Sequence, residues 1–311
     1  MSTLKRLIIF ILYICLSACS STPGTPTAIS TSLTPPISNP QNGTTQEGPG
    51  PTATPLPLAL IVNGDAITLD EFNAELARYQ ASQVALGNHL TDQQAAAPVI
   101  DAFVSELLLA QGAQEAGFTL DDAALQTRID ALATKLGGAE KLSAWQQAHG
   151  YSAESFGGAL KRQAAAAWMR DKIVSDVPST AEQVHVRQIL LYNQDSANNY
   201  YSQLEAGADF DTLAAEVEFA HLGKSVTGGD IGWIPRGYLA EKPIEDAAFA
   251  LEPNQYSIVI GDNVGFHILK LIERQANRAL SPDQILTVQN RALDEWVANR
   301  RQQSNVVLAP K

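Results

Sequence analysis

The segment VHVRQILLY, Val184–Tyr192, reads as a β-strand that carries one polar side chain on an apolar face. Successive side chains of a strand point to opposite faces, so Gln188 shares a face with Val184 and Val186. A buried amide that lacks hydrogen-bond partners costs free energy. Gln188 is therefore predicted either to be satisfied inside the core or to belong to a polar site.

The remainder of the chain after Pro178 indicates a compact α+β domain. Helical patterns occupy 200–205, 210–216 and the segment IEDAAFAL, and two further strands are predicted in YSIVI and GFHILKLIE. A strand, helices and returning strands within about 95 residues are typical of the α+β class.

The region before Pro178 is predicted to be mainly α-helical. LALIVNGDAITLDEFNAEL begins with a short strand, turns at 63–65 and enters a helix at Thr68, with Glu71 completing a capping box. Another helix is expected to start at Thr119. The stripe of an amphipathic helix runs through Ile100, Phe103, Val104, Leu107 and Leu108.

A last helix is predicted to follow SPDQ, 281–284. This segment supplies an N-cap, a proline at the first helical position and a capping-box glutamine. One face of the helix carries an apolar stripe that needs a partner, and the N-terminal helices are the nearest candidates. The stripe consists of Ile285, Val288, Ala292 and Trp296.

The first nineteen residues are typical of a targeting signal. Lys5 and Arg6 precede an apolar run, 7–16, that is too short to span a bilayer comfortably. The next segment, LSAC, resembles the lipobox of bacterial lipoproteins, in which the cysteine is lipid-modified and becomes the new N-terminus. Cys19 is therefore predicted to anchor the chain to the membrane outside the cytoplasm, and an ordinary cleaved signal with an incidental thiol is the alternative.

Residues 20–57 are expected to form a disordered stalk. Ser, Thr, Pro and Gly dominate this segment and Glu47 is its only charge, so it cannot bury a core. At about 3.3 Å per residue it could reach on the order of 100 Å. The formal net charge of the whole chain is −12, and no basic patch suggests a nucleic-acid partner.

Three segments of the α+β region together resemble the parvulin-type peptidyl-prolyl isomerases: HVRQILL, TGGDIGWIPRG and VGFHILKLIER, in this order. LEAGADFDTLAAE and KPIEDAAFALEPNQ fit the same pattern between them. IVNGDAITLDEF and the helices after it resemble the chaperone domain of the SurA and PrsA group of extracytoplasmic foldases. In that group the C-terminal helix returns to the N-terminal helices, and the parvulin domain is inserted between them.

The resemblance implies the fold class and the layout of the chain. The fold is expected to be α+β, with a helical chaperone domain completed by the C-terminal helix and an inserted PpiC-type parvulin domain. The expected boundaries are a signal peptide at 1–19, a stalk at 20–57, the chaperone domain at 58–177, the parvulin domain at 178–275 and the C-terminal helix at 276–311.

The resemblance also implies the site. Rotation about an X-Pro bond crosses a barrier of about 20 kcal/mol without making or breaking a covalent bond, so an apolar cup and well-placed donors suffice in principle. Leu239, Ile244 and Phe249 fall in or beside the cup, and ordinary core packing is their alternative. Of the two histidines that family members place at the floor of the site, His267 is present and the other position holds Gln188.

Other positions depart from the family pattern or have a structural interpretation. A cysteine or aspartate usually precedes the glycine pair, and the nearest matches here are Ala220 and His221, for which a solvated loop position is the alternative. The glycine pair, 228–229, with Asp230 and Trp233, reads as a structural corner that shapes the pocket.

The expected function is that of a membrane-tethered foldase. Its partners would be unfolded or partly folded secreted polypeptides that contain X-Pro bonds. Gln188 can donate and accept hydrogen bonds but cannot titrate, so weak isomerase activity is expected, and a pocket that only binds is the rival. A surface lipoprotein for attachment or ligand capture is a third possibility. The clients, the oligomeric state and the membrane that holds the anchor stay open.

No cofactor or metal is predicted. His185, His221 and His267 lack the paired spacing of metal ligands, and no phosphate loop, dinucleotide fingerprint or nucleophile elbow appears. The segment YNQDSANN contains no Lys or Arg, so a preference for phosphorylated Ser-Pro or Thr-Pro is not expected.

Overall fold

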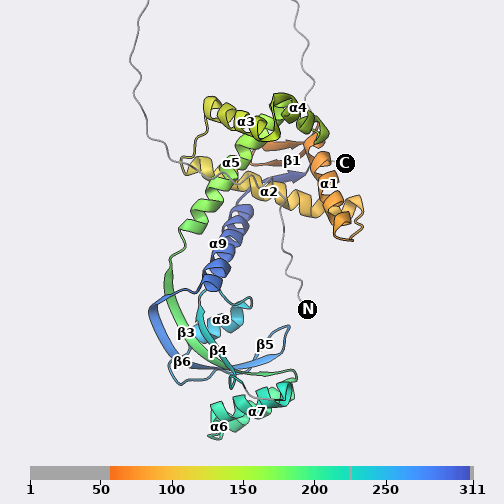
Figure 1. Ribbon diagram of the computed structural model, residues 1–311. Helices are drawn as coiled ribbons and strands as arrows, with labels where there is room; N and C mark the ends of the chain where they lie inside the picture. Colours follow the sequence, from red (N-terminus) through yellow and green to blue (C-terminus); the bar gives the residue numbers. More distant parts are fainter. Residues whose placement is uncertain (1–56, 224–225, 309–311) are drawn as a thin grey trace, which may run out of the picture. The chain divides into compact units, whose positions relative to one another are not determined.

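The computed structural model describes residues 57–223 and 226–308 of the chain (Figure 1). Residues from Leu58 onwards form one compact unit. The predicted signal peptide, the lipidation site Cys19 and all but the last residue of the predicted stalk lie outside the described residues.

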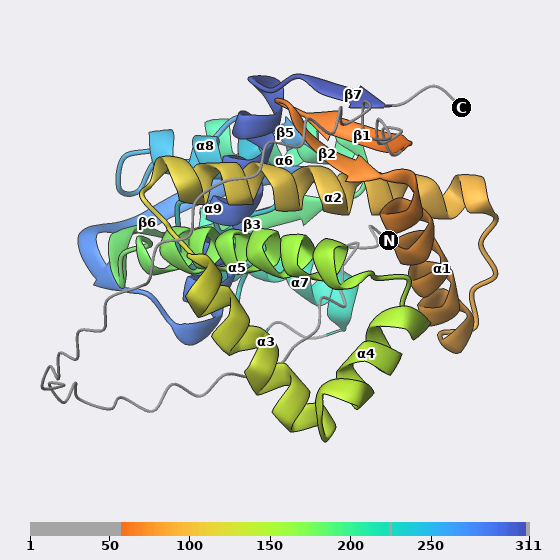
Figure 2. The ribbon, with the colours of Figure 1, turned by 90° about the horizontal axis from the view of Figure 1, so that it is seen from above.

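The N-terminal part consists of a β-hairpin followed by helices. The hairpin strands are β1 (Leu58–Val62) and β2 (Asp65–Thr68), and the helices are α1 (Leu69–Ala85), α2 (Asp92–Glu115), α3 (Asp122–Leu136), α4 (Ala139–Ala148) and α5 (Ala153–Ser175). The hairpin turn is the one predicted at 63–65, with Asn63 and Gly64 at positive φ. Helices α2 and α5 lie side by side, as Figures 1 and 2 show.

Two helix starts differ from the prediction. Thr68 caps α1 by accepting the N–H of Glu71 at 3.2 Å, but the Glu71 carboxylate pairs with Arg162 instead of closing the capping box. Helix α3 begins two residues later than expected after Thr119, because Asp121 accepts the N–H of Ala124 and provides the cap.

Helix α2 is the core helix of the N-terminal part. By length and composition it is the one helix among the described residues that could cross a membrane. Its apolar side chains are nevertheless packed in the interior against β1, β2 and the partly buried side chains of α1. The predicted stripe supplies most of this core through Phe103, Val104, Leu107 and Leu108.

The chain then forms an antiparallel sheet with helices on both faces. Its elements are β3 (Thr180–Leu191), α6 (Gln194–Glu205), α7 (Phe210–Leu222), β4 (Asp230–Pro235), α8 (Lys242–Ala250), β5 (Ile260–Gly261) and β6 (Phe266–Ala279). The strand order is β4-β3-β6-β5. The strand predicted in YSIVI is shorter than expected, since only Ile260 belongs to β5 and Tyr256 makes an isolated bridge to Lys270.

The two faces of the sheet bury separate clusters. Val184 and Val186 pack with Leu269 and Leu271 against α8 on one face. Ile189 and Leu191 pack with Ile268 against α6 and α7 on the other. The predicted alternation of β3 is therefore confirmed, and Gln188 stands on the face that α8 covers, directly opposite Leu269.

The C-terminal segment returns to the N-terminal part. Helix α9 (Pro282–Gln302) places Trp296 against Gly112 of α2, and Arg301 pairs with Asp101 at 2.8 Å. Strand β7 (Val306–Leu308), which the sequence did not predict, pairs with β1 and completes a three-stranded sheet of order β2-β1-β7. The helical part is thus completed by the C-terminal helix, while the boundaries at 177 and 275 stay a prediction within one compact unit.

Candidate functional site

Gln188 and His267 meet on the two central strands of the larger sheet. His267 on β6 lies opposite Leu190, two pairs along the ladder from Gln188 and on the same face. The Nδ1 atom of His267 lies 3.2 Å from Oε1 of Gln188. His267 is 7 % exposed, whereas Gln188 is half-buried. The structure therefore brings together the two residues that the resemblance placed at the floor of the site.

A carboxylate that the sequence reasoning missed holds the other side of His267. The Nε2 atom of His267 lies 3.2 Å from Oδ2 of Asp262, whose side chain is 7 % exposed. Oδ1 of Asp262 accepts the N–H groups of Val264 and Gly265 at 2.7 and 2.8 Å. Burial acts to raise the pKa of Asp262, but these backbone donors and His267 outweigh it and lower the pKa. Asp262 is therefore an ionised neighbour of the imidazole at neutral pH.

The proton arrangement of His267 depends on the orientation of the Gln188 amide. With Oε1 of Gln188 as the acceptor, the hydrogen bond needs a proton on Nδ1, whereas Nε2 lies near the Asp262 carboxylate without a hydrogen-bond partner. Turning the amide by a half rotation places its NH₂ group against Nδ1, which then accepts the hydrogen bond. Either arrangement fixes the plane of the ring.

The glycine pair is required by a close backbone approach. The N–H of Gln188 donates to the carbonyl oxygen of Gly229 at 2.8 Å. Gly229 has a φ of +77°, and a Cβ atom there would lie 2.2 Å from the carbonyl oxygen of Gln188. Glu218 accepts the N–H groups of Val226, Thr227 and Gly228 and holds the preceding turn. These contacts support the structural interpretation of the corner.

The opposite face of β3 carries a second histidine with a structural role. His185 places Nε2 2.9 Å from Oδ1 of Asp230 and stacks on Trp233 with 5.2 Å between ring centroids. The guanidinium of Arg278, on β6, lies 4.2 Å from the centroid of the Trp233 ring on β4. Asp230 also accepts the N–H of Gly232 at 2.7 Å, as expected for a residue that holds the turn. Trp233 is half-buried and contacts the ring of His185 and the guanidinium of Arg278.

The three residues predicted for the apolar cup belong to one cluster on the face of Gln188 and His267. Ile244 and Phe249 are each 5 % exposed and form part of the core with Val184 and Leu269. Leu239 is half-buried and packs against this cluster. Of the three, only Leu239 retains substantial exposed surface, and Ile244 and Phe249 are core residues.

Two family models match the chain. Residues 191–273 match the PPIC-type PPIase domain, and residues 57–150 match the SurA-like N-terminal domain. The chain contains a PPIC-type PPIase domain. It also contains a SurA-like N-terminal domain, so both parts of the predicted resemblance are confirmed. His267 lies inside the matched PPIase residues, whereas Gln188 lies three positions before them.

Known relatives cover part of the chain. Chaperone SurA from Methylococcus capsulatus is 35% identical over 120 residues, which are 36% of this chain and 25% of the relative. A parvulin-like PPIase from Rickettsia bellii is 35% identical over 97 residues, which are 30% of this chain and 34% of the relative. The chain thus spans about a quarter to a third of the length of these relatives.

Solved structures of foldases are also similar. The crystal structure of the peptidylprolyl isomerase PrsA from Bacillus cereus is 20% identical, and the match covers 76% of this chain and 85% of that chain with a TM-score of 0.42.

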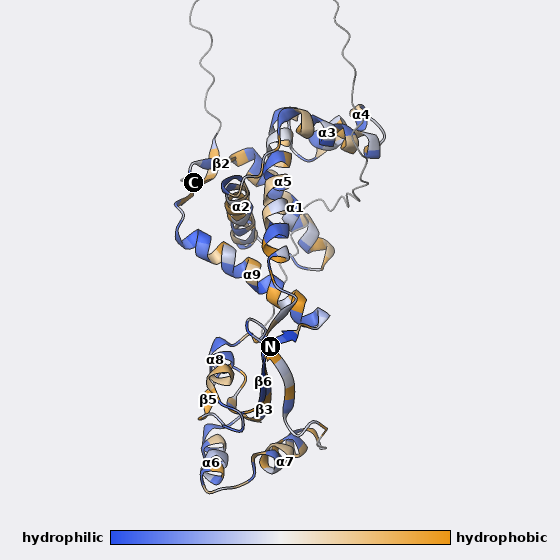
Figure 3. Cartoon of the chain, turned by 90° about the vertical axis from the view of Figure 1, so that its left-hand side faces the viewer, coloured by the Kyte–Doolittle hydropathy of each residue, from blue (hydrophilic) through white to orange (hydrophobic). Residues whose placement is uncertain are grey.

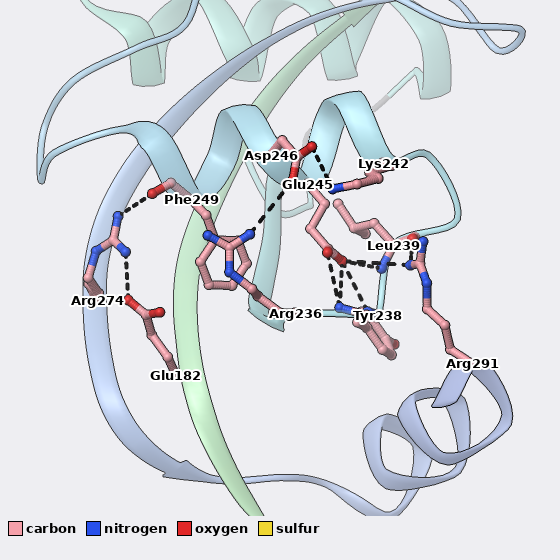
Figure 4. Close-up of polar contacts among 11 residues, drawn as sticks. Glu182, Arg236, Tyr238, Leu239, Lys242, Glu245, Asp246, Phe249, Arg274 and Arg291 are labelled. Carbon is pink, nitrogen blue, oxygen red and sulfur yellow. Dashed lines mark hydrogen bonds and ion pairs between the residues drawn. The ribbon is translucent and has the colours of Figure 1, made fainter. Parts of the chain in front are cut away.

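The connection from β4 to α8 in the PPIase domain is organised around a buried carboxylate (Figure 4). Glu245, 7 % exposed at its side chain, accepts the N–H groups of Gly237, Tyr238 and Leu239 at 2.9–3.2 Å. Sequence reasoning did not single out Glu245, although an acidic residue in the first turn of a helix is suited to such donors.

Two arginines flank Phe249 of the PPIase domain. The guanidinium of Arg236 lies 4.0 Å from the centroid of the Phe249 ring. Arg274 donates to the carbonyl oxygens of Phe249 and Leu251 at 2.8 and 2.9 Å and pairs with Glu182, as Figure 4 shows in part. These contacts hold the C-terminal end of α8 on the sheet.

His221 and Ala220 lie on the last turn of α7 rather than in a loop. Both residues are exposed, and the His221 ring lies 5.0 Å from the ring of Tyr192. No described contact joins His221 to Gln188 or His267. Among residues 57–223 and 226–308, no group of three potential ligands could hold a metal ion.

Proposed function

We propose that this chain is an extracytoplasmic, membrane-tethered foldase that isomerises X-Pro bonds and binds unfolded secreted polypeptides on its SurA-like domain. The observation that carries the proposal is the position of His267 in the PPIase domain. Its imidazole is held between Gln188 and Asp262 on the sheet face that also carries Leu239.

The proposed mechanism needs no covalent chemistry. The amide loses its resonance as the X-Pro bond rotates, which accounts for a barrier of about 20 kcal/mol. Leu239, supported by Ile244 and Phe249, would hold the proline ring in apolar surroundings. The polar group formed by His267, Gln188 and Asp262 would interact more favourably with the twisted amide than with the planar one, and only such a difference lowers the barrier.

A chaperone with a pocket that binds without catalysis is the second candidate. The observation that favours it is Gln188, since the resemblance places a titratable histidine at this position. The SurA-like and PPIase domains together argue against a lipoprotein that only attaches the cell or captures a ligand.

A protease-coupled assay on a proline peptide with purified residues 58–311 separates the two candidates. We expect cis-to-trans isomerisation above the uncatalysed rate, reduced in His267→Ala and unchanged in His89→Ala, a control in which the replaced histidine is exposed. A wild type that does not accelerate isomerisation, yet suppresses aggregation of an unfolded protein, would establish the binding-only chaperone.

The membrane anchor rests on LSAC and is tested separately. Cys19→Ser is expected to release the protein from the membrane fraction or to stall its processing. A normally processed variant that stays in membranes, together with a wild type that incorporates no labelled lipid, would refute lipidation of Cys19.

A further inference from the structure

The first turn of α9 is hydrogen-bonded to β4, the strand that precedes the connection to α8. Gln284 closes the capping box by accepting the N–H of Ser281 at 2.9 Å, and its Nε2 donates to the carbonyl oxygen of Trp233 on β4 at 2.7 Å. Gln284 is the one buried residue of this helix, which is mostly hydrophilic along its length (Figure 3). Polar contacts, more than apolar burial, therefore hold this end of α9 against the PPIase domain.

Two turns further along α9, Arg291 reaches the pocket loop itself, defined here as residues 236–240. Its Nη1 donates to the carbonyl oxygen of Leu239 at 2.5 Å and lies 3.9 Å from Oε2 of Glu245. Glu295, one turn later, accepts from Nε of Arg291 at 3.2 Å. Figure 4 shows the Arg291 side chain extending from α9 towards this loop.

Helix α9 packs on the loop at Gly237 at ordinary van der Waals distance, and the positive φ of this residue favours glycine. A Cβ atom at Gly237 would lie 3.5 Å from Cδ of Arg291 and 3.9 Å from Cγ1 of Val288, and its φ is +82°. Tyr238 adds a contact from its hydroxyl to Asp283 at 3.4 Å. The loop therefore lies on α9 over three successive residues.

Two oppositely charged side chains, from α8 and α9, thus set the conformation of the pocket loop. Glu245 of α8 holds the N–H groups of the loop, and Arg291 of α9 holds the carbonyl group of Leu239. Glu245 is 7 % and Arg291 is 25 % exposed at the side chain, so solvent replaces neither contact easily. Leu239, the partly exposed residue of the proposed cup, stands between them.

We propose that Arg291 is a positioning residue, through which α9 fixes the pocket loop and sets the affinity of the PPIase pocket for proline. Because Trp296 of the same helix packs against Gly112 of α2, the docking of α9 on the SurA-like part and the shape of the pocket depend on one element. This inference rests on the proposed isomerase function.

The test compares three variants of residues 58–311, the compact unit of the chain. Arg291→Met keeps the packing of the side-chain stem but removes the charge and the donor. Arg291→Lys keeps a cation and one donor to Leu239. Arg301→Met is the matched control, because it removes another α9 ion pair, to Asp101, without touching the loop.

Michaelis constants separate positioning from a structural role. We expect Arg291→Met to raise KM for the proline peptide by about tenfold, the effect of losing one hydrogen bond to a charged group, with kcat close to the wild-type value. The KM of Arg291→Lys should lie between the values for Arg291→Met and the wild type, and the KM of Arg301→Met should match the wild-type value. Equal KM values for Arg291→Met and Arg301→Met would overturn the inference.

Hydrogen exchange supplies a measurement that does not need activity. Loss of Arg291 should speed exchange of the amides of Gly237, Tyr238 and Leu239, while the peptide around Gln188 keeps its wild-type exchange. A wild type without isomerase activity would refute the proposed isomerase function but not, by itself, the inference about Arg291. The inference would then stand only if Arg291→Met both speeds this exchange and weakens binding of the proline peptide, and unchanged exchange would refute it as well.

A second variant covers the case in which Arg291→Met does not fold. Glu295→Gln leaves Arg291 in place but removes the carboxylate that orients its guanidinium. We then expect a smaller rise in KM in the same direction and faster exchange in the same three amides. A folded Glu295→Gln protein with wild-type KM and exchange would overturn the inference.

Discussion

At the scale of single residues, the proposed site differs from the parvulin pattern at Gln188 and includes a carboxylate, Asp262, beside His267. Gln188 and His267 are 79 positions apart, yet their side chains meet across β3 and β6. The amide accepts or donates a hydrogen bond but cannot change its charge, so Gln188 can orient His267 without exchanging protons. Asp262 orients the same imidazole from the β5–β6 turn.

Restoring a histidine at position 188 tests the role of this pair. We expect Gln188→His to fold, because the position already accepts a polar side chain, and to raise the isomerisation rate severalfold. Circular dichroism must first show native structure, since a polar group that loses its partners costs about 1–3 kcal/mol. An active wild type that is indifferent to both Gln188→His and His267→Ala would mean that the apolar cup alone carries catalysis.

Asp262 makes a prediction about acid stability. Its pKa is lowered from the ordinary value of 3.8 in the folded protein, so the folded state binds this proton less readily than the unfolded chain. The ionised carboxylate therefore stabilises the folded state at pH values above the ordinary pKa. This stabilisation is lost as the pH falls through the lowered pKa of the folded protein.

We therefore expect Asp262→Asn to be less stable than the wild type at pH 7 and the difference to shrink below about pH 4, as urea unfolding at several pH values would show. Asp171→Asn is the matched control, because the Asp171 side chain is 80 % exposed. A difference between Asp262→Asn and wild type that stays constant from pH 7 to pH 3 would contradict the assigned role of this carboxylate.

At the scale of elements, α9 joins the two parts of the folded chain. Its first half contacts the pocket loop through Arg291, and its second half packs on α2 through Trp296. Gly112 permits this packing, because a Cβ atom there would lie 2.6 Å from Cη2 of Trp296. The predicted stripe of α9 thus finds its partner on the helical part at Trp296, whereas Val288 faces the PPIase domain.

Gly112→Ala tests the docking of α9. Alanine usually favours a helix over glycine by about 1 kcal/mol, but overpacking of a core costs about 1–3 kcal/mol, so we expect net destabilisation. Gly158→Ala on α5 is the matched control, because no atom lies within 4 Å of its added Cβ, and it should be neutral or stabilising. Thermal unfolding would measure both variants.

A double variant identifies the clash. Trp296→Phe shortens the ring that meets position 112, so Gly112→Ala should cost less in that background. Additive effects of the two substitutions would show that Gly112 and Trp296 are not coupled and that α9 docks differently.

At the scale of the whole molecule, the PPIase domain is an insertion whose two ends lie together. Thr180 pairs with Ala279 across β3 and β6, and the N–H of Leu280 donates to the carbonyl oxygen of Ser179 at 2.9 Å. The helical part is closed instead by the C-terminal segment, since β7 pairs with β1. An insertion with adjacent ends and its own buried clusters is expected to fold by itself.

Removal of residues 280–311 tests this organisation. Without α9 and β7 the helical part loses the ring of Trp296 from two clusters and one strand from its sheet. We expect its unfolding temperature to fall, while an isolated segment 178–280 keeps the circular dichroism of a folded domain. Unchanged unfolding of the helical part would show that its core does not depend on the C-terminal segment.

The sequence by itself determined the elements with a clear local signature. The alternation of β3, the capping box at Ser281 and the apolar stripe of α2 report burial and chain direction within a few residues, and all three are present in the structure. The resemblance identified both domains and the positions of Gln188 and His267, although from the residues alone Gln188 was only an amide on an apolar face.

Only the tertiary structure decided which groups meet. Asp262 faces His267 across a hairpin turn, and Arg291 reaches a carbonyl group 52 positions away. The sequence did not predict β7, and it predicted a longer strand at β5. Both strands have only two or three residues, too few to show a hydrophobic period, and their pairing depends on distant partners. Hydrophobic periodicity records that a side chain is buried, but not against what, and the choice of partner depends on contacts between segments that are remote in the chain.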